Sequence, residues 1–147
     1  MREDGALSPD ATAAPSHAMP AVPVSWGELI DKITILEIKE QRLSSPQAIA
    51  NVRKELAALS RAVAELKPAP AALNALKQQL KAINEKLWEV EDAIRAKEAA
   101  KTFDARFIDL ARAVYVHNDE RAGIKREINE LLKSGLVEEK QYTPYSA

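Results

Sequence analysis

Apolar residues recur at spacings of three and four through most of the chain, and this spacing predicts four amphipathic helices. The last run begins near Phe107 and ends near Leu131. Two cationic positions, His117 and Arg121, interrupt its apolar stripe at the centre. Because unpaired charge is costly to bury, we expect polar partners for these two residues on a facing helix. The whole stripe consists of Phe107, Leu110, Val114, His117, Arg121, Ile124, Ile128 and Leu131.

The first predicted helix has a strong start signal. Ser25 is a favourable N-cap, and Glu28 stands at the position that completes a capping box. The helix is expected to extend to about Leu43, and its apolar residues are not confined to one side. It therefore predicts contact with several helices or with a second copy of the chain. Two carboxylates, Glu37 and Glu40, fall on its main apolar face.

The second and third helices are separated by a proline-containing break. Ser45 followed by Pro46 is typical of a helix start, and the apolar pattern then continues to Leu66. The segment Lys67–Pro70 ends that helix, and a longer patterned run follows it. Two such helices joined by a short turn predict an antiparallel hairpin with a coiled-coil-like seam.

The fold class predicted from these patterns is all-α, an elongated up-down bundle of four main helices with a long antiparallel coiled-coil-like hairpin. Residues 1–24 hold four of the eight prolines and are interpreted as a disordered leader, residues 25–135 as the bundle, and residues 136–147 as a tail packing on it. Residues 99–104 contain neither glycine nor proline, so a turn and a kinked continuous helix both remain open there. Gly135 is the predicted left-handed C-cap of the last helix.

Composition narrows the function classes. The 147 residues contain 21 basic and 22 acidic side chains, a net charge of −1, so no general field attracts nucleic acid. With only four glycines and 5% aromatic residues, the composition also favours helices. The sequence has no cysteine, no apolar run long enough for a membrane span and no secretory signal pattern, and we expect a cytoplasmic protein.

The first candidate site joins the interrupted stripe to the acidic residues of the first helix. Arg121 could hold a carboxylate of Glu37 or Glu40 in a bidentate pair, and His117 could donate to another. The alternative is a polar layer that only fixes the register of the helices. With two histidines and no cysteine in the chain, no histidine-rich metal site and no cofactor is predicted.

The second candidate site consists of two polar ridges at helical spacing. The first ridge is Asn84, Trp88, Glu91 and Arg95 on the third helix, and the second is Tyr115, Asn118, Ala122, Lys125 and Asn129 on the fourth. If they face each other, Trp88 could stack on a phosphorylated or sugar-like ligand while Arg95, Arg121 and Lys125 hold its anionic oxygens. The alternative is a solvated flank with Glu91 and Arg95 as an ordinary ion pair.

Catalytic patterns are weak in this chain. Glu37 and Glu40, with Glu89 and Asp92, match the letters of helical nucleotide pyrophosphatases, but the second pair falls on the outer face of its helix. No serine or threonine lies near His117 in a nucleophilic arrangement. The sequence therefore favours interaction or ligand binding, with an enzyme acting on a nucleotide-sugar or phosphate ester as the alternative. A purely structural scaffold is the third reading.

Four segments resemble a short all-helical bacterial family of unknown function, and the resemblance covers residues 22–145. These segments are 22–39 (VPVSWGELIDKITILEIK), 87–95 (LWEVEDAIR), 118–129 (NDERAGIKREIN) and 138–142 (EEKQY). The resemblance implies an accessory role near surface-polysaccharide or lipopolysaccharide genes, with a possible protein partner there, and it supplies no established catalytic residues. Independently of it, the apolar breadth of the first helix and the long seams predict a homodimer.

Overall fold

The computed structural model of the protein describes residues 17–145. Within this range the chain forms four α-helices and no strand, which confirms the all-α class. The helices are α1 (Trp26–Arg42), α2 (Pro46–Ala64), α3 (Ala71–Ala99) and α4 (Ala105–Leu131). Of the predicted leader, residues 17–24 contain no regular structure, and residues 1–16 lie outside the described range. None of these four helices is long and apolar enough to cross a membrane.

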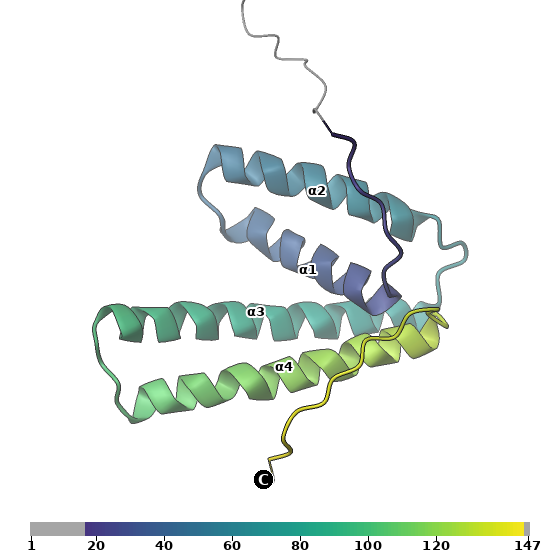
Figure 1. Cartoon of the computed structure of the whole chain (residues 1–147). Coiled ribbons are helices and arrows are strands. Elements are labelled where there is room, and N and C mark those ends of the chain that lie inside the picture. Colours follow the sequence, from purple (N-terminus) through teal and green to yellow (C-terminus); the bar gives the residue numbers. More distant parts are fainter. Residues whose placement is uncertain (1–16, 146–147) are drawn as a thin grey trace, which may run out of the picture.

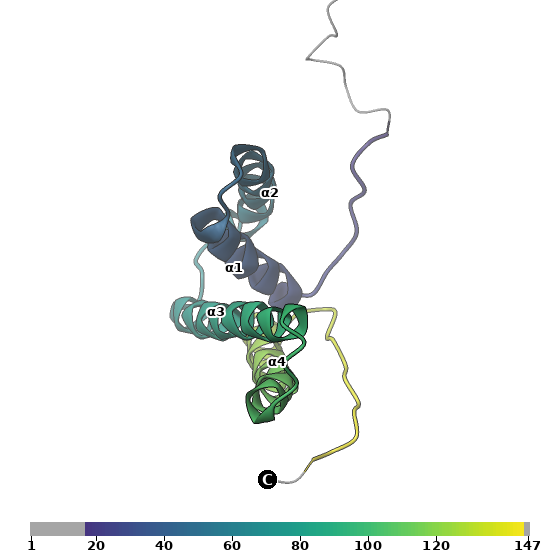
Figure 2. The same ribbon diagram turned by 90° about the vertical axis from the view of Figure 1, so that its left-hand side faces the viewer.

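The helices form two antiparallel pairs, and one pair lies across the other (Figures 1 and 2). The longer pair is α3 with α4, and the shorter pair is α1 with α2. The predicted pairing of the second helix with the third is therefore wrong, since α2 packs on α1 and not along α3. The apolar spacing defined the stripe on each helix but could not define its partner. The linker at residues 65–70 carries the chain from one pair to the other.

Helix α1 is the central element because it alone contacts all three other helices. Ile30 lies in a core cluster with Leu73 and Leu80 of α3 and Ile128 of α4. Farther along α1, Ile38 is also 1% exposed. Full burial of each such side chain contributes about 1.5 to 3 kcal/mol. Neighbours within one chain thus cover the several apolar sides of this helix.

The N-caps follow the predicted chemistry in two helices. Ser25 Oγ accepts a hydrogen bond from the Glu28 N–H at 3.2 Å, and Ser45 Oγ accepts from the Ala48 N–H at 3.4 Å. The other half of the predicted capping box is not formed as a local pair. The Glu28 carboxylate instead accepts a hydrogen bond from Lys125 of α4. A tertiary partner replaces the local one.

Two lysines with positive φ end the long helices. Lys101 (φ 53°) lies in a genuine turn between α3 and α4, where the Thr102 N–H donates to the Lys97 carbonyl at 3.0 Å. Lys133 (φ 50°) has the same role after α4, so the prediction that Gly135 is the left-handed cap is wrong. Gly135 lies beyond the helix end and has no positive φ. Helix α4 ends earlier because the Ser134 N–H turns back to the Asn129 carbonyl at 2.8 Å.

Candidate functional site

A polar stripe on α1 faces the α3–α4 pair. Gly27, Asp31, Thr34 and Ile38 are spaced four, three and four residues apart, and all four are buried. The sequence interpretation recognised the apolar breadth of this helix but did not assign a role to Asp31 or Thr34. Their spacing, which is that of a core seam, was the signal that could have identified them.

Asn84 of α3 connects this stripe to α4. Its side chain is 5% exposed, and its Nδ2 donates to Asp31 Oδ1 at 2.8 Å and to Thr34 Oγ1 at 2.9 Å. Thr34 Oγ1 in turn donates to the Asp31 carbonyl at 2.8 Å. Because these bonds use both hydrogens of the amide nitrogen, Asn84 Oδ1 is left as an acceptor. It accepts from an Nη of Arg121 at 3.3 Å.

Arg121 does not pair with the acidic residues predicted for it. Glu37 binds Lys77 at 2.8 Å and Lys81 at 3.4 Å. Glu40 binds Arg53 at 3.2 Å, so the predicted pairing with Arg121 is wrong. These carboxylates turn toward lysines of α3 and an arginine of α2, whose long side chains reach them at the helix flank. Arg121 instead meets the neutral amide of Asn84.

Two buried nitrogen atoms on this face of α4 lack a hydrogen-bond partner among the described residues. They are Arg121 Nε and His117 Nδ1. The Glu120 carboxylate is 3.5 Å from His117 Nδ1, at the limit of hydrogen-bond distance. Buried polar atoms in folded proteins are nearly always satisfied, by protein, water or a ligand. Arg121 therefore has hydrogen-bonding capacity that residues 17–145 do not use.

A cavity of about 520 Å³ opens beside Arg121, and we call it the interlayer cleft. It lies where α1, α3 and α4 meet, and Ile35, Ile38 and Leu87 provide its apolar part. Its lining also includes Lys39 and Asp92, which the sequence interpretation had not selected as site residues. Six of the candidate residues line it: Asn84, Trp88, Glu91, Arg95, Asn118 and Arg121.

Two contacts position the aromatic and charged groups of the cleft. The Arg42 guanidinium lies 6.0 Å from the centre of the Trp88 ring, a distance at which cation–π attraction operates. Glu91 and Arg95 form the i,i+4 ion pair expected from their spacing, at 3.3 Å. The Arg95 side chain is 81% exposed, so this pair contributes little to stability and Arg95 is free to reorient.

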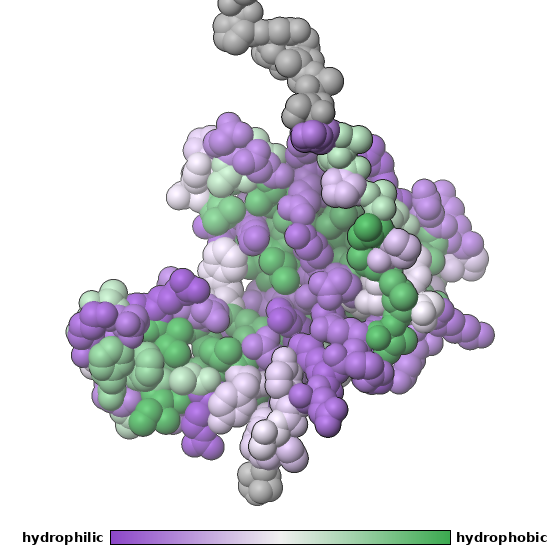
Figure 3. Space-filling view, in the orientation of Figure 1, coloured by the Kyte–Doolittle hydropathy of each residue, from purple (hydrophilic) through white to green (hydrophobic). Residues whose placement is uncertain are grey.

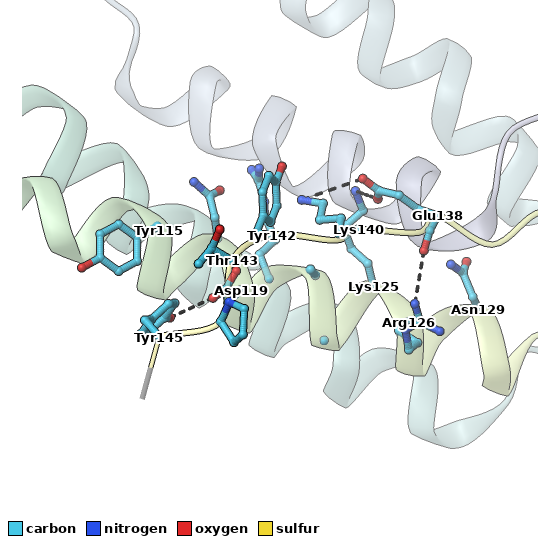
Figure 4. A pocket seen from close by; sticks show the side chains of 15 residues that line it. Tyr115, Asp119, Lys125, Arg126, Asn129, Glu138, Lys140, Tyr142, Thr143 and Tyr145 are labelled. Carbon is cyan, nitrogen blue, oxygen red and sulfur yellow. Dashed lines mark hydrogen bonds and ion pairs between the residues drawn. The ribbon is translucent and has the colours of Figure 1, made fainter. Parts of the chain in front are cut away.

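The second polar ridge lines a different cavity, so the two ridges do not face each other. All five of its residues, from Tyr115 to Asn129, border a cavity of about 1170 Å³ between α4 and residues 138–145. We call this space the tail cavity (Figure 4). Asn118 and Arg121 line both cavities. The two spaces are therefore neighbours on either side of the Arg121 position.

Lys125 is the best-compensated charge of the tail cavity. Its side chain is 6% exposed, and its Nζ donates to Glu28 at 2.7 Å and to Glu138 at 2.6 Å. Burial opposes the charged form of Lys125, but the hydrogen bonds with Glu138 and Glu28 outweigh it, and the pKa of Lys125 is raised. The same contact lowers the pKa of Glu138. With two carboxylates bound, Lys125 is not free to hold a ligand anion.

A close approach of α1 to α4 places these groups together. The Gly27 N–H donates to Asn129 Oδ1 at 2.7 Å, and the Trp26 N–H donates to Ser134 Oγ at 3.3 Å. A Cβ atom on Gly27 would lie 2.5 Å from the Lys125 carbonyl oxygen, so only glycine permits this separation. Two free N–H groups at the start of α1 are thereby satisfied by side chains of the α4 end.

The charged groups that line the interlayer cleft are three cations and two carboxylates. Within residues 17–145, no three His, Cys, Asp or Glu side chains converge as a metal ion would require. Glu89, one of the residues of the pyrophosphatase-like pattern, is bound to Arg42 at 3.3 Å. The interlayer cleft instead offers the cations Lys39, Arg95 and Arg121 beside an aromatic ring.

Comparison with known proteins identifies a family without assigning an activity. No curated protein and no solved structure matches this chain. A family model does match, over residues 20–147, which includes every described residue of the helices and of both cavities. The chain therefore belongs to the family described as "Family of unknown function (DUF6165)".

Proposed function

We propose that this protein binds a small molecule with anionic oxygens, such as a phosphate ester or an acidic sugar, in the interlayer cleft. The observation that carries the proposal is the incomplete hydrogen bonding of Arg121. One Nη is fixed by Asn84, while Nε is buried without a partner among the described residues. A guanidinium held in this way can donate further hydrogen bonds to an oxyanion without first losing an ion pair.

The rest of the cleft supports the same ligand chemistry. Lys39 and Arg95 offset the carboxylates of Glu91 and Asp92, so that with Arg121 the lining has a net positive charge. Trp88, Ile38 and Leu87 add apolar surface. Asn118 supplies an amide that can both donate and accept. A volume of about 520 Å³ lies within the range of about 300 to 1,000 Å³ found for small-molecule sites.

The setting we propose is an accessory role in the synthesis of bacterial surface polysaccharide or lipopolysaccharide, in the cytoplasm and with a protein partner. This part of the proposal rests on the family resemblance of residues 22–145 and not on the geometry of the cleft. Loss of surface polysaccharide on deletion of the gene, restored by the native chain but not by the Arg121→Gln variant, would support it. Normal polysaccharide in the deletion strain would exclude the role.

A homodimer remains part of the proposal, although α1 is covered by neighbours within one chain. The remaining argument is the set of exposed apolar side chains on the part of the α3–α4 pair that extends beyond α1 and α2 (Figure 1). These include Phe103 (56% exposed), Ile108 (56%) and Val116 (36%), and the apolar colouring of that end is visible in Figure 3. Light scattering at high micromolar concentration should give twice the chain mass; a monomer there excludes the dimer.

Isothermal titration calorimetry and thermal shift measurements test the ligand proposal. The ligands are inorganic phosphate, pyrophosphate, glucose 1-phosphate and, as the uncharged control, glucose. We expect the phosphorylated ligands to bind, and Arg121→Gln to weaken them at least tenfold, because one charge-assisted contact is worth about 1.5 to 3 kcal/mol. Arg106→Gln is the matched control, since Arg106 is exposed on the same helix and lines neither cavity. Equal binding by both variants would contradict the proposal.

The enzyme alternative is favoured by one observation: the buried His117 Nδ1, one turn from Arg121, has no hydrogen-bond partner among the described residues and only the Glu120 carboxylate at 3.5 Å. His117 lines neither cavity, so its imidazole could exchange a proton only with a substrate that extends beyond them from Arg121. Its predicted carboxylate partner Glu37 is occupied by Lys77 and Lys81, which weakens the alternative. Turnover of nucleotide-sugars or phosphate esters that is lost in His117→Gln would establish it. Binding without turnover, with or without magnesium, leaves the ligand-binding function.

A purely structural scaffold, the third alternative, binds no ligand. It predicts that no compound changes the melting temperature.

A further inference from the structure

The interlayer cleft and the tail cavity meet at a single cation. Both are lined by Asn118 and Arg121, and the two lining sets otherwise differ completely. A ligand anion bound by Arg121 would therefore have one cavity on each side of it. The chemistry of the two sides indicates what should be attached to that anion.

The cleft side is suited to a planar, partly apolar group. Trp88 provides an aromatic face, while Ile35, Ile38 and Leu87 provide aliphatic contacts. The amides and carboxylates at its edge can hydrogen-bond a ring carrying donors and acceptors. With a volume of about 520 Å³ the cleft is large enough for a nucleoside.

The tail side is suited to an uncharged, hydroxyl-rich group. Tyr115, Asn118, Asp119, Tyr142 and Thr143 line it with phenol, amide, carboxylate and hydroxyl groups. Figure 4 shows Tyr142 extending from the tail on the side opposite Tyr145, whose hydroxyl is bonded to Asp119 at 2.8 Å. Tyr142 is 75% exposed, and its hydroxyl has no such bond to any described residue. It is available to stack on a sugar ring.

The other cations of the tail cavity are compensated within the chain. Lys125 binds Glu28 and Glu138, Arg126 binds Glu139 at 3.0 Å, and Lys140 lies 3.8 Å from Glu138. Arg121 also lines this cavity, and it has no carboxylate partner among the described residues. A second anionic group is therefore not expected in the tail cavity.

We infer that the ligand is a nucleoside diphosphate sugar that spans both cavities. The diphosphate lies at Arg121, the base packs on Trp88 in the interlayer cleft, and the sugar lies in the tail cavity against Tyr142. This inference rests on the proposed function, because it needs the anion site at Arg121. It adds the two groups that flank the anion and the separate residues that recognise each.

Calorimetric titrations of the full chain separate the three parts of the ligand. The probes are uridine and guanosine diphosphates, the same nucleotides carrying glucose or mannose, glucose 1-phosphate, and geranyl diphosphate. For the native chain we expect at least one nucleotide-sugar to bind severalfold more tightly than its nucleoside diphosphate. Geranyl diphosphate should bind at least tenfold more weakly than that nucleoside diphosphate, because it lacks a base for Trp88.

Two substitutions, one in each cavity, should divide the affinity by cavity. Tyr142→Ala should abolish the gain from the sugar and leave the affinity for the nucleoside diphosphate unchanged. Trp88→Leu should weaken nucleotides at least tenfold and leave glucose 1-phosphate within twofold. Leu136→Ala is the control for Tyr142, since Leu136 is exposed on the same segment and lines neither cavity. Circular dichroism of each variant shows whether it is folded, and Tyr142→Phe, which keeps the ring, should retain most of the sugar gain.

The outcomes distinguish this inference from the proposed function. If phosphate esters bind through Arg121 but nucleotide-sugars bind no better than nucleoside diphosphates, the sugar site is wrong and the anion site stands. If geranyl diphosphate binds as well as the nucleotides, the base site is wrong and the anion site stands. If no phosphorylated compound binds, both proposals are wrong together.

Discussion

Lys125 and Arg121 lie one turn apart on α4, but their side chains have different kinds of partner. Lys125 is buried and donates to two carboxylates, Glu28 of α1 at 2.7 Å and Glu138 of the tail at 2.6 Å. Arg121 contacts a neutral amide at 3.3 Å and keeps a buried Nε without a partner among the described residues. Since an unpaired buried cation is costly, the first arrangement stabilises the fold, while the second leaves binding capacity for an anion.

The largest expected effect tests how tightly the Lys125 region is packed. Gly27→Ala should lower the free energy of unfolding by about 2 to 3 kcal/mol, because its Cβ would lie 2.5 Å from the Lys125 carbonyl oxygen. The matched control is Gly123→Ala on α4, where an added Cβ meets nothing within 4 Å. That change should raise the free energy of unfolding by up to about 1 kcal/mol. Urea denaturation measures both, and similar values for the two would refute the close approach.

The next effect tests the link between α1 and Arg121. Asn84→Leu should cost about 2 to 3 kcal/mol, because Asp31, Thr34 and Arg121 all lose their shared buried partner. Asn74→Leu, an exposed change on the same helix, should alter stability by less than about 0.5 kcal/mol. Binding of pyrophosphate to Asn84→Leu should also weaken, since the guanidinium is no longer oriented. Unchanged stability and binding would exclude this link through Asn84.

Replacing each of the two cations by methionine compares them directly. Lys125→Met should destabilise the fold by about 1 to 3 kcal/mol, because it leaves two carboxylates without their cation, although solvent reaches both of them. Arg121→Met should cost at most about 1 kcal/mol but should remove phosphate-ester binding. Denaturant titration and calorimetry on the same samples measure the two quantities. If the stability losses were reversed, the assignment of roles would be reversed too.

The smallest effect is the pH dependence of the tail contact. The pKa of Glu138 is lowered by its hydrogen bond to Lys125, so its stabilising contribution is complete above the ordinary value of 4.5 and disappears as pH falls through the lowered value. The pKa of Lys125 is raised, so its contribution is complete below 10.5 and disappears only at higher pH. NMR signals of residues 138–145 should therefore be constant near neutrality and change in acid below 4.5. The Glu138→Gln variant should lack this acid transition.

Local sequence signals were reliable wherever the chemistry was local. Ser25 and Ser45 cap their helices as their residue types indicate, and the polar ridge from Asn84 to Arg95 lines a cavity. The misses have tertiary causes. The Glu28 carboxylate binds Lys125, 97 positions away in the chain, in preference to the free N–H beside it. A charge-assisted bond to a buried ammonium outweighs a local bond that water can replace.

The sequence by itself determined the apolar stripes of the helices and most of their boundaries to within a few residues, because helix periodicity, caps and prolines act over short distances. It left open whether a turn separates α3 from α4, and it did not identify the buried polar positions of α1. The tertiary structure decided which helices pair, and it gave Arg121 an amide partner and Lys125 two carboxylates. Apolar stripes are interchangeable as partners, so the choice depends on side-chain contacts such as the close approach at Gly27. For the same reason, Arg121 and Lys125, one helical turn apart, have different roles.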